Sequence, residues 1–307
     1  MSRTIAGREP IGAKIGEDYR ITIPNPWESP RRKKNRSRAQ PAIPRVSGRG
    51  FWYYKLRLGQ CGEQWLIGSS FDGTFLIDRD GATIRVFCQS LPPRQEVIDI
   101  LARRILPRLT ILFGATAIHS AALGDRAGGL MLLGQSGAGK STLTAALAQL
   151  AAWDVLSDDI SILWSGAQIL LAPAATGVCV WPQTRAELDL ETMHCSEMPG
   201  YDGKLRYDPG VDQTLDPVPL RSFVFLQRSI ECHAPRLDPI PHAEALAAAI
   251  GQLIKFNPDA PFSQERAVLI DRTNRMMRTI PSWRLTYPEA YAALPAVTDA
   301  LRGLMRG

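Results

Sequence analysis

The stretch that decides the fold is residues 131–163, MLLGQSGAGKSTLTAALAQLAAWDVLSDDISIL. It begins with an apolar run, passes through a glycine-rich loop, and continues from Lys140 as a segment rich in alanine and leucine. This order predicts a buried strand, a phosphate-cradling loop and a helix over 140–151. A second apolar run then ends at two adjacent aspartates, Asp158 and Asp159, which follow the lysine closely in the sequence.

The loop fits the pattern GxxxxGK[ST]. Its glycines allow backbone N–H groups to turn inward around phosphate oxygens, and the helix that follows points its positive end at the same charge. In this pattern the lysine, here Lys140, reaches the outer phosphates, and the hydroxyl of Ser141 holds Mg²⁺. The predicted nucleotide-binding residues are Gly134, Gln135, Ser136, Gly137, Ala138, Gly139, Lys140, Ser141 and Thr142.

The aspartate pair suits phosphoryl transfer to an alcohol. A carboxylate at the end of a neighbouring strand can hold the Mg²⁺ that bridges the terminal phosphates. A second carboxylate can accept the proton of the attacking hydroxyl. We predict Asp158 as the general base and Asp159 as the metal ligand beside Ser141, in a strand that pairs with the strand before the loop. The reverse assignment stays open, and so does a pair in which one aspartate only caps the turn.

Three further polar residues are candidates for the site. His119 belongs to a predicted strand over 117–125, just before the strand that enters the loop, and strand pairing could place its imidazole at the phosphates as an orienting or electrophilic group. A purely structural histidine is the alternative. Lys204 and Arg206 lie in DGKLRYDP (202–209), a loop that is either solvated or closes over phosphates and substrate.

The charge of the chain is unevenly distributed. The net charge is +6, but residues 1–50 hold 12 Lys or Arg against 4 Asp or Glu, which leaves the remainder at −2. This leader is rich in Pro, Arg and Ser, so we predict that it is disordered and serves either as a solubilising segment or as an arm that docks an acidic partner, RNA or a peptide. The folded body has no cluster of basic residues of the kind that contacts nucleic acid, so we do not expect it to bind nucleic acid.

The rest of the chain divides into two predicted domains. Short alternating segments separated by turn residues predict a small antiparallel β domain over 51–90. Residues 91–307 predict an α/β catalytic domain that begins with an amphipathic helix kinked at Pro107, contains a loop-rich middle over 165–220 and ends with further helices.

The cysteines and the apolar runs indicate the compartment. Five cysteines show no metal-ligand spacing, which is typical of reduced thiols in a cytosolic protein. The longest uncharged apolar run, 109–124, is short for a membrane span. We therefore expect a cytoplasmic protein that does not enter a membrane.

Three segments carry a family resemblance: IHSAAL (118–123), GGLMLLGQSGAGKSTL (128–143) and DVLSDDISIL (154–163). In this order they resemble the catalytic domain of HPr kinase/phosphorylase. They are more similar still to the shorter HPr-kinase-like serine kinases of peptide-modification gene clusters, including those of lasso peptides. The spacing of loop and aspartates is also similar to that of the ATP-dependent phosphoenolpyruvate carboxykinase fold.

The resemblance implies a P-loop kinase core with a mixed sheet, which uses ATP and Mg²⁺ to phosphorylate a serine hydroxyl of a protein or a ribosomally made peptide, and it is compatible with a homo-oligomer. The family's functional positions correspond to His119, Lys140, Ser141, Asp158 and Asp159. The chain lacks the downstream glycine-rich signature and the separate N-terminal domain of true HPr kinases, so the reverse phosphorylase reaction and HPr as acceptor are not carried over. Two alternatives are a small-molecule kinase on the same scaffold and a nucleotide-binding regulatory module with little catalysis.

Overall fold

The structure is a computed structural model that divides into two compact units. It describes residues 19–22, 50–52, 56–69, 73–81, 83–88, 93–174, 177–190, 195–198, 203–209, 216–257 and 264–305. The first unit comprises residues 1–101 and 256–261, and the second comprises 102–255 and 262–307.

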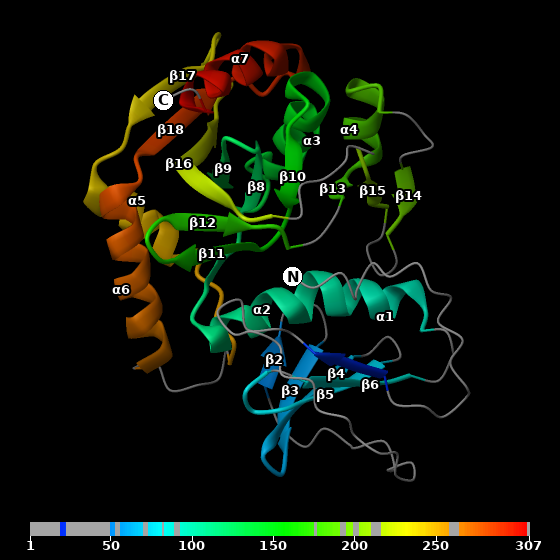
Figure 1. Cartoon of the computed structure of the whole chain (residues 1–307). Coiled ribbons are helices and arrows are strands. Elements are labelled where there is room, and N and C mark those ends of the chain that lie inside the picture. The colour runs from blue at the N-terminus through cyan, green and yellow to red at the C-terminus, as the bar shows by residue number, and fades with distance from the viewer. Residues whose placement is uncertain are drawn as a thin grey trace. The chain divides into compact units, whose positions relative to one another are not determined.

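The first unit is built on a six-stranded antiparallel sheet in the order β1-β6-β5-β4-β3-β2 (Figure 1). Side chains alternate between its two faces, and Phe75 with Ile77 and Ile84 with Val86 form part of the buried set. The predicted antiparallel sheet is confirmed, and its first predicted segment contributes to two strands, β2 and β3, that pair with each other. The elements are β1 (Tyr19–Thr22), β2 (Gly50–Trp52), β3 (Leu56–Cys61), β4 (Gln64–Ser69), β5 (Gly73–Ile77), β6 (Thr83–Phe87) and α1 (Gln95–Ile100).

This unit differs from the predicted boundaries at three places. Strand β1 pairs with β6 and lies inside the leader predicted to be disordered. The charged run at 30–50 lies outside the described residues apart from Gly50. The unit extends past residue 90, since Val97 of α1 is buried and lies next to Gly73 of β5. It also takes in 256–261, where Phe256 packs edge-on against Trp65 with ring centroids 5.1 Å apart.

The second unit is built on a nine-stranded mixed sheet whose long central strand is β16 (Val218–Arg228). β16 runs parallel to β9 on one side and to β18 on the other, whereas its first residues pair antiparallel with β12. The predicted α/β class, with a mixed sheet and a separate small antiparallel sheet, is confirmed. The other strands are β7 (Thr116–Ile118), β8 (Ala121–Asp125), β9 (Gly128–Leu133), β10 (Asp154–Ser157), β11 (Ser161–Ser165), β12 (Ile169–Ala172), β17 (Arg236–Pro239) and β18 (Ser282–Tyr287).

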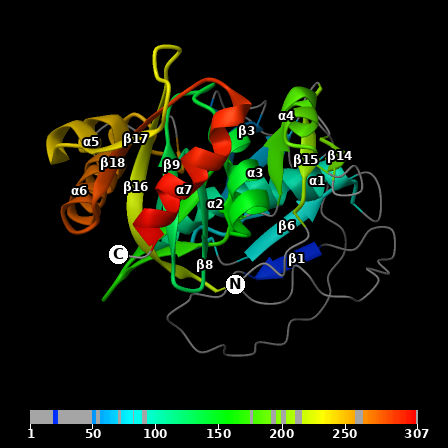
Figure 2. The ribbon, with the colours of Figure 1, turned by 90° about the horizontal axis from the view of Figure 1, so that it is seen from above.

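Helices cover both faces of this sheet (Figures 1 and 2). Alternate residues of β9 point to opposite faces, so Leu130 and Leu132 pack with α3 and α7, while Met131 and Leu133 pack with α5 and α6. A strand buried on both faces reads as an unbroken apolar run, as this one does. These helices are α3 (Lys140–Ala151), α5 (His242–Ile250), α6 (Gln264–Thr279) and α7 (Leu294–Met305), which follows η4 (Tyr291–Ala293).

The order of the strands corrects the prediction that the strand leading to the aspartates pairs with the strand before the glycine-rich loop, but it still places the loop and the aspartates at one edge of the sheet. Strand β10, which leads to the aspartates, does not pair with β9, because β8 lies between them in the order β10-β8-β9. Since β8 is antiparallel to both, β10 and β9 run parallel and end at the same edge of the sheet. The glycine-rich loop and the aspartate pair therefore leave the sheet side by side.

The predicted strand over 117–125 is also divided. It breaks at His119 and Ser120 into β7 and β8, which pair with different strands. The buried Ser120 hydroxyl donates to the carbonyl of Ile118 and to Ser161, and these bonds hold the bend. His119 therefore projects from a bend and not from a strand.

The remaining elements surround this core. Near Pro107 the chain forms a π-helical turn (Leu101–Ile105) followed by a short α-helix (Leu106–Leu109) that holds the proline at its second residue. The middle region predicted as loop-rich holds a helix and a three-stranded sheet in the order β13-β15-β14. These elements are η1 (Leu101–Ile105), α2 (Leu106–Leu109), η2 (Thr110–Phe113), β13 (Val178–Val180), α4 (Pro182–Glu187), β14 (Cys195–Glu197) and β15 (Leu205–Tyr207).

Two expectations about composition can be compared with the structure. All five cysteines are free thiols, as predicted. Within the described part of the chain, no helix combines the length and the apolar character needed to span a membrane.

The β8–β9 hairpin should tolerate no side chain at Gly124. A Cβ there would lie 2.2 Å from the carbonyl oxygen of Gly128 and 2.6 Å from the Cα of Gly129, both backbone atoms. We expect Gly124→Ala to lower the free energy of unfolding by about 1–3 kcal/mol, measured by urea denaturation. Gly303 in α7 is the matched control, because a Cβ there meets no atom within 4 Å; Gly303→Ala should stabilise by up to about 1 kcal/mol.

Candidate active site

The glycine-rich loop joins the end of β9 to the start of α3. Gly137 and Gly139 both have a left-handed backbone, with φ of 83° and 88°. At Gly139 a Cβ would also lie 2.5 Å from the Tyr287 hydroxyl, so glycine is required there for both conformation and space. Lys140 folds back over the loop and its Nζ donates to the carbonyl oxygens of Gly134 at 2.6 Å and Gln135 at 3.2 Å.

The structure brings Lys140 and Ser141 together with the aspartate pair. Burial lowers the pKa of Lys140, and the nearby charges of Asp159 and Asp158 partly offset this effect. The Ser141 side chain is close enough to Asp158 to lower the pKa of that carboxyl by hydrogen bonding. The two motifs predicted to act together thus meet at one edge of the sheet.

Asp158 is the buried member of the pair, with a side chain only 2% exposed. Its Oδ2 accepts from the backbone N–H of Cys179 at 2.7 Å and lies 3.8 Å from an Arg103 nitrogen. Its Oδ1 is buried and has no hydrogen-bond partner among the described residues. Burial raises the pKa of Asp158, against the smaller opposing effects of Arg103 and the Cys179 N–H.

Asp159 is the accessible member, with a side chain 25% exposed. It forms an ion pair with Arg104, and His119 Nδ1 lies 3.2 Å from its Oδ1 and 2.9 Å from its backbone carbonyl oxygen. Burial alone would raise the pKa of Asp159, but the hydrogen bond from His119 and the charge of Arg104 outweigh it and lower the pKa. Because Nδ1 faces two acceptors, the neutral imidazole keeps its proton there and leaves Nε2 as an acceptor.

Three buried arginines complete the site, and the sequence analysis did not identify them. Arg103 and Arg104 of η1 each pair with one of the two aspartates. Arg108 of α2 donates to the carbonyl of Arg104 at 2.8 Å, and burial followed by repulsion from Arg104 lowers its pKa to about 10. The sequence LARRILPRL (101–109) could have identified them, because arginines on an otherwise apolar helix are rarely buried unless they are paired with an acidic group.

A buried serine network holds the two bends of the site. The Ser161 hydroxyl lies 2.6 Å from that of Ser157 and 2.8 Å from that of Ser120, and it donates to the Ser120 carbonyl at 3.2 Å. Ser120 is next to His119, while Ser157 and Ser161 flank the aspartates. The network therefore fixes the His119 bend against the aspartate turn, which accounts for their close approach.

Of the two substrate candidates from the middle region, Lys204 lies in a loop as predicted, whereas Arg206 does not. Arg206 lies in strand β15 and not in a loop, because the apolar residues on either side of it alternate as in a strand and Tyr207 is buried. Its register partner is Cys179, whose N–H binds Asp158. Lys204 places its ammonium 5.0 Å from the ring centroid of Trp181. Contact with a substrate stays a prediction for both.

The remaining loop residues line the mouth of the site. Gln135 and Ser136 are exposed, the Ala138 carbonyl accepts from the Tyr287 hydroxyl at 2.8 Å, and the Thr142 hydroxyl lies 3.3 Å from that of Thr184. These contacts fix the loop while leaving its tip open.

Few protein ligands are available for a metal. Among the described residues, no group of three or more His, Cys, Asp and Glu side chains converges on one point. Mg²⁺ is commonly held by one or two protein groups plus substrate phosphates and water, so a full protein cage is not required. The unpartnered Oδ1 of Asp158 and the adjacent Ser141 hydroxyl fit that requirement.

Comparison with known proteins gives distant likenesses among solved structures alone. The sequence matches no model of a known family, and no curated protein matches it. Among solved structures, the chain is similar to the HPr(Ser) kinase/phosphatase from Coxiella burnetii, with a TM-score of 0.34 and 15% identity, over 62% of this chain and 99% of that chain. A TM-score this low does not establish a shared fold, so the chemistry has to be judged from the residues of this chain.

We expect the Arg103–Asp158 pair to be needed for folding. Arg103→Met leaves a buried carboxylate without its cation, which typically costs about 3–5 kcal/mol in the free energy of unfolding. In an Asp158→Asn background the same change should cost clearly less, because no charge is left unpaired. Urea denaturation of the two single variants and the double variant measures this coupling.

The control for this cycle is Arg275→Met, which breaks an exposed pair with Asp271 and should cost less than about 1 kcal/mol. Equal losses for Arg103→Met in both backgrounds would contradict the importance of the buried pair.

Proposed function

We propose that this protein is a kinase that transfers the γ-phosphate of ATP, with Mg²⁺, to the hydroxyl of a serine in a peptide or protein. One observation carries the proposal: Lys140 and Ser141, at the start of α3, lie at the same sheet edge as two adjacent carboxylates. This arrangement supplies cations for the phosphates and a proton acceptor for the incoming hydroxyl. The serine-containing acceptor follows from the sequence resemblance and not from the geometry.

The proposed step requires only positioning and one proton transfer. The acceptor oxygen attacks the γ-phosphorus, a new O–P bond forms, and the bond between that phosphorus and the β,γ-bridging oxygen breaks, so that ADP leaves with the electron pair. The hydroxyl proton passes to a carboxylate of the site. Lys140 balances the charge on the outer phosphate oxygens, and the N–H groups of the loop hold the remaining oxygens. Mg²⁺, when bound, neutralises charge between the β- and γ-phosphates.

The environments of the two aspartates favour the reverse of the roles predicted from the sequence. Asp158 faces Ser141, its side chain is 2% exposed, and its buried Oδ1 lacks a partner, which suits a metal ligand held beside the loop hydroxyl. A side chain so deeply buried is poorly placed to contact a peptide hydroxyl. Asp159 is 25% exposed and its lowered pKa keeps it ionised at neutral pH, so it can accept a proton from an acceptor that reaches the surface.

His119 and Arg104 act through Asp159 in this proposal. Their contacts with the carboxylate fix its orientation from two directions. The imidazole Nε2 is left as an acceptor, so His119 can orient the hydroxyl of the acceptor substrate, which donates to that atom.

Lys140→Met should weaken the binding of ATP with Mg²⁺. Removing a charge-assisted hydrogen bond typically costs about 1.5–3 kcal/mol, which corresponds to roughly 10- to 100-fold in affinity. Calorimetric titration with ATP and Mg²⁺ measures the change, and exposed Arg275→Met serves as the control that removes a cation elsewhere. Unchanged affinity in the lysine variant would remove the nucleotide site on which the proposal depends.

The aspartate variants separate metal binding from catalysis. We expect Asp159→Asn to bind ATP and Mg²⁺ normally but to lose about 10²–10⁴-fold in transfer to a serine-containing acceptor, because an amide cannot accept the proton. Asp158→Asn should instead weaken the Mg²⁺-dependent part of ATP affinity and recover partly at raised Mg²⁺. The measurements are ATP affinity with and without Mg²⁺, and phosphate incorporation.

The opposite pattern would restore the roles predicted from the sequence. If transfer is found in the unmodified protein but neither variant affects it, the kinase mechanism proposed here is wrong. Nucleotide binding without transfer to serine peptides would favour a small-molecule kinase or a nucleotide-binding module.

A further inference from the structure

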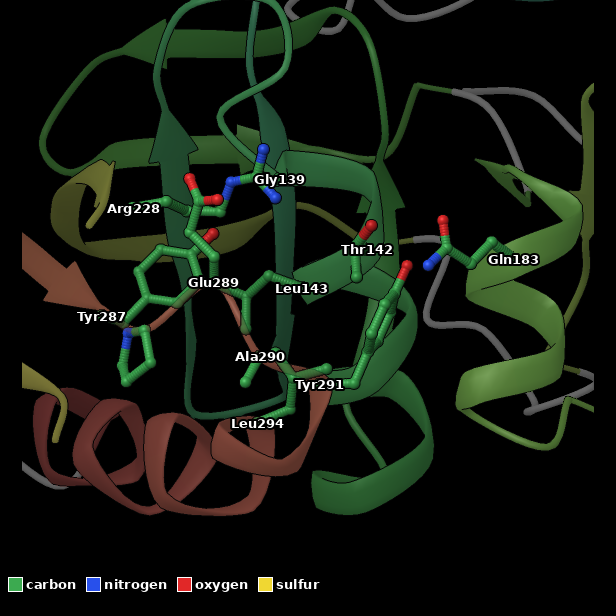
Figure 3. Close-up of a pocket in the computed structure, with 11 residues that line it drawn as sticks. Gly139, Thr142, Leu143, Gln183, Arg228, Tyr287, Glu289, Ala290, Tyr291 and Leu294 are labelled. Carbon is green, nitrogen blue, oxygen red and sulfur yellow. The ribbon is translucent and has the colours of Figure 1, made fainter. Parts of the chain in front are cut away.

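A pocket lies beside the glycine-rich loop, at the start of α3 (Figure 3). It has a volume of about 180 Å³ and shares Gly139 and Thr142 with the loop and the start of α3. It contains neither Lys140 nor Ser141 nor either aspartate. The other lining residues are Leu143, Gln183, Arg228, Tyr287, Pro288, Glu289, Ala290, Tyr291 and Leu294.

The sheet order explains this position. The aspartates follow β10, on the β8 side of β9, whereas Arg228 ends β16 and Tyr287 ends β18, on the other side of β9. Because β9, β16 and β18 are parallel, their carboxyl ends share one edge, where open α/β sheets bind ligands. A triphosphate whose outer end lies at Lys140 and the aspartates must direct its other end toward the β16 and β18 loops.

The chemistry of the lining suits a nucleoside. Figure 3 shows Leu143, Ala290 and Leu294 grouped as an apolar floor, with Tyr291 beside them and Gln183 facing in from α4. Pockets for small molecules typically combine apolar and aromatic walls with a few polar groups that fix orientation. A volume of about 180 Å³ is below the roughly 300–1,000 Å³ of pockets for whole drug-sized ligands, so the cavity fits one moiety.

Hydrogen bonds tie the walls of the pocket to the loop. The Tyr287 hydroxyl donates to the Ala138 carbonyl at 2.8 Å, and Arg228 donates to the Gly137 carbonyl at 2.6 Å. On the opposite wall, the Thr184 hydroxyl lies 3.3 Å from that of Thr142 and 3.1 Å from that of Tyr291. The pocket is therefore formed before a ligand arrives and is held in register with the phosphate-cradling glycines.

We propose that this pocket binds the base of the nucleoside triphosphate whose phosphates occupy the loop. The inference rests on the proposed function, because it requires phosphates at Lys140. The ring of Tyr291 offers the base a flat aromatic surface, and Gln183 and Glu289 at the exposed rim offer polar groups to its edge.

The test compares ATP with inorganic tripolyphosphate, which has the phosphates and no nucleoside. Ala290→Trp fills the pocket from an exposed position, and we expect it to weaken ATP binding about tenfold or more, the typical value of one base–aromatic stack, while tripolyphosphate binding is unchanged. Ala292→Trp is the matched control, since Ala292 is exposed two residues further on and does not line the pocket, and it should change neither affinity. Tyr291→Ala provides a second variant that opens the wall instead of filling it.

The outcomes distinguish this inference from the proposed function. Calorimetry in which the unmodified protein binds tripolyphosphate as tightly as ATP would overturn the pocket alone, as would unchanged ATP affinity in both pocket variants. If the unmodified protein binds neither ligand, the proposed nucleotide site fails and the pocket assignment fails with it. Selective loss of ATP in both variants, with Ala292→Trp unaffected, establishes the pocket.

Discussion

The structure of the site depends on two adjacent carboxylates, one buried and one partly exposed. Consecutive like charges removed from water are strongly unfavourable unless cations accompany them. Here η1 supplies two consecutive arginines, and each takes one aspartate: Arg103 pairs with Asp158, and Arg104 pairs with Asp159. The arginines in turn fix η1 and α2 against the end of β10, so the charge pairs connect the helix before the sheet to the turn that carries the chemistry.

The order of the strands determines the order of the functional groups along one edge of the sheet. β8 separates β10 from β9, and β16 and β18 lie on the far side of β9, so the aspartates and the pocket wall formed by Arg228 and Tyr287 are on opposite sides of the glycine-rich loop. A ligand that extends along this edge meets polar, charged groups at one end and tyrosines with aliphatic side chains at the other. That gradient matches a molecule with a polyanionic end and a flat organic end.

Local patterns in the sequence predicted the parts of the site whose geometry is local. The loop needs left-handed glycines, and α3 begins at the lysine that the motif assigns, so both could be located without the fold. The arginines could not be assigned partners in this way, because Arg104 and Asp159 are 55 residues apart and nothing in either segment specifies the other. The position of β10 beside β8, and not beside β9, likewise depends on pairing between segments that are distant in the sequence, which an apolar run that suits either neighbour does not determine.

The same limit explains why the roles of the aspartates were ambiguous in the sequence, whereas their environments in the structure differ. Neighbouring residues on a turn can point in different directions, and here one side chain enters the protein toward Ser141 while the other stays at the surface beside His119. Burial raises the pKa of Asp158 and hydrogen bonding lowers that of Asp159, so two chemically identical groups acquire different properties. Phosphoryl transfer at one phosphate would need both kinds of carboxylate. A metal ion that stays bound favours a buried ligand, whereas a proton that must leave with each turnover favours an accessible carboxylate.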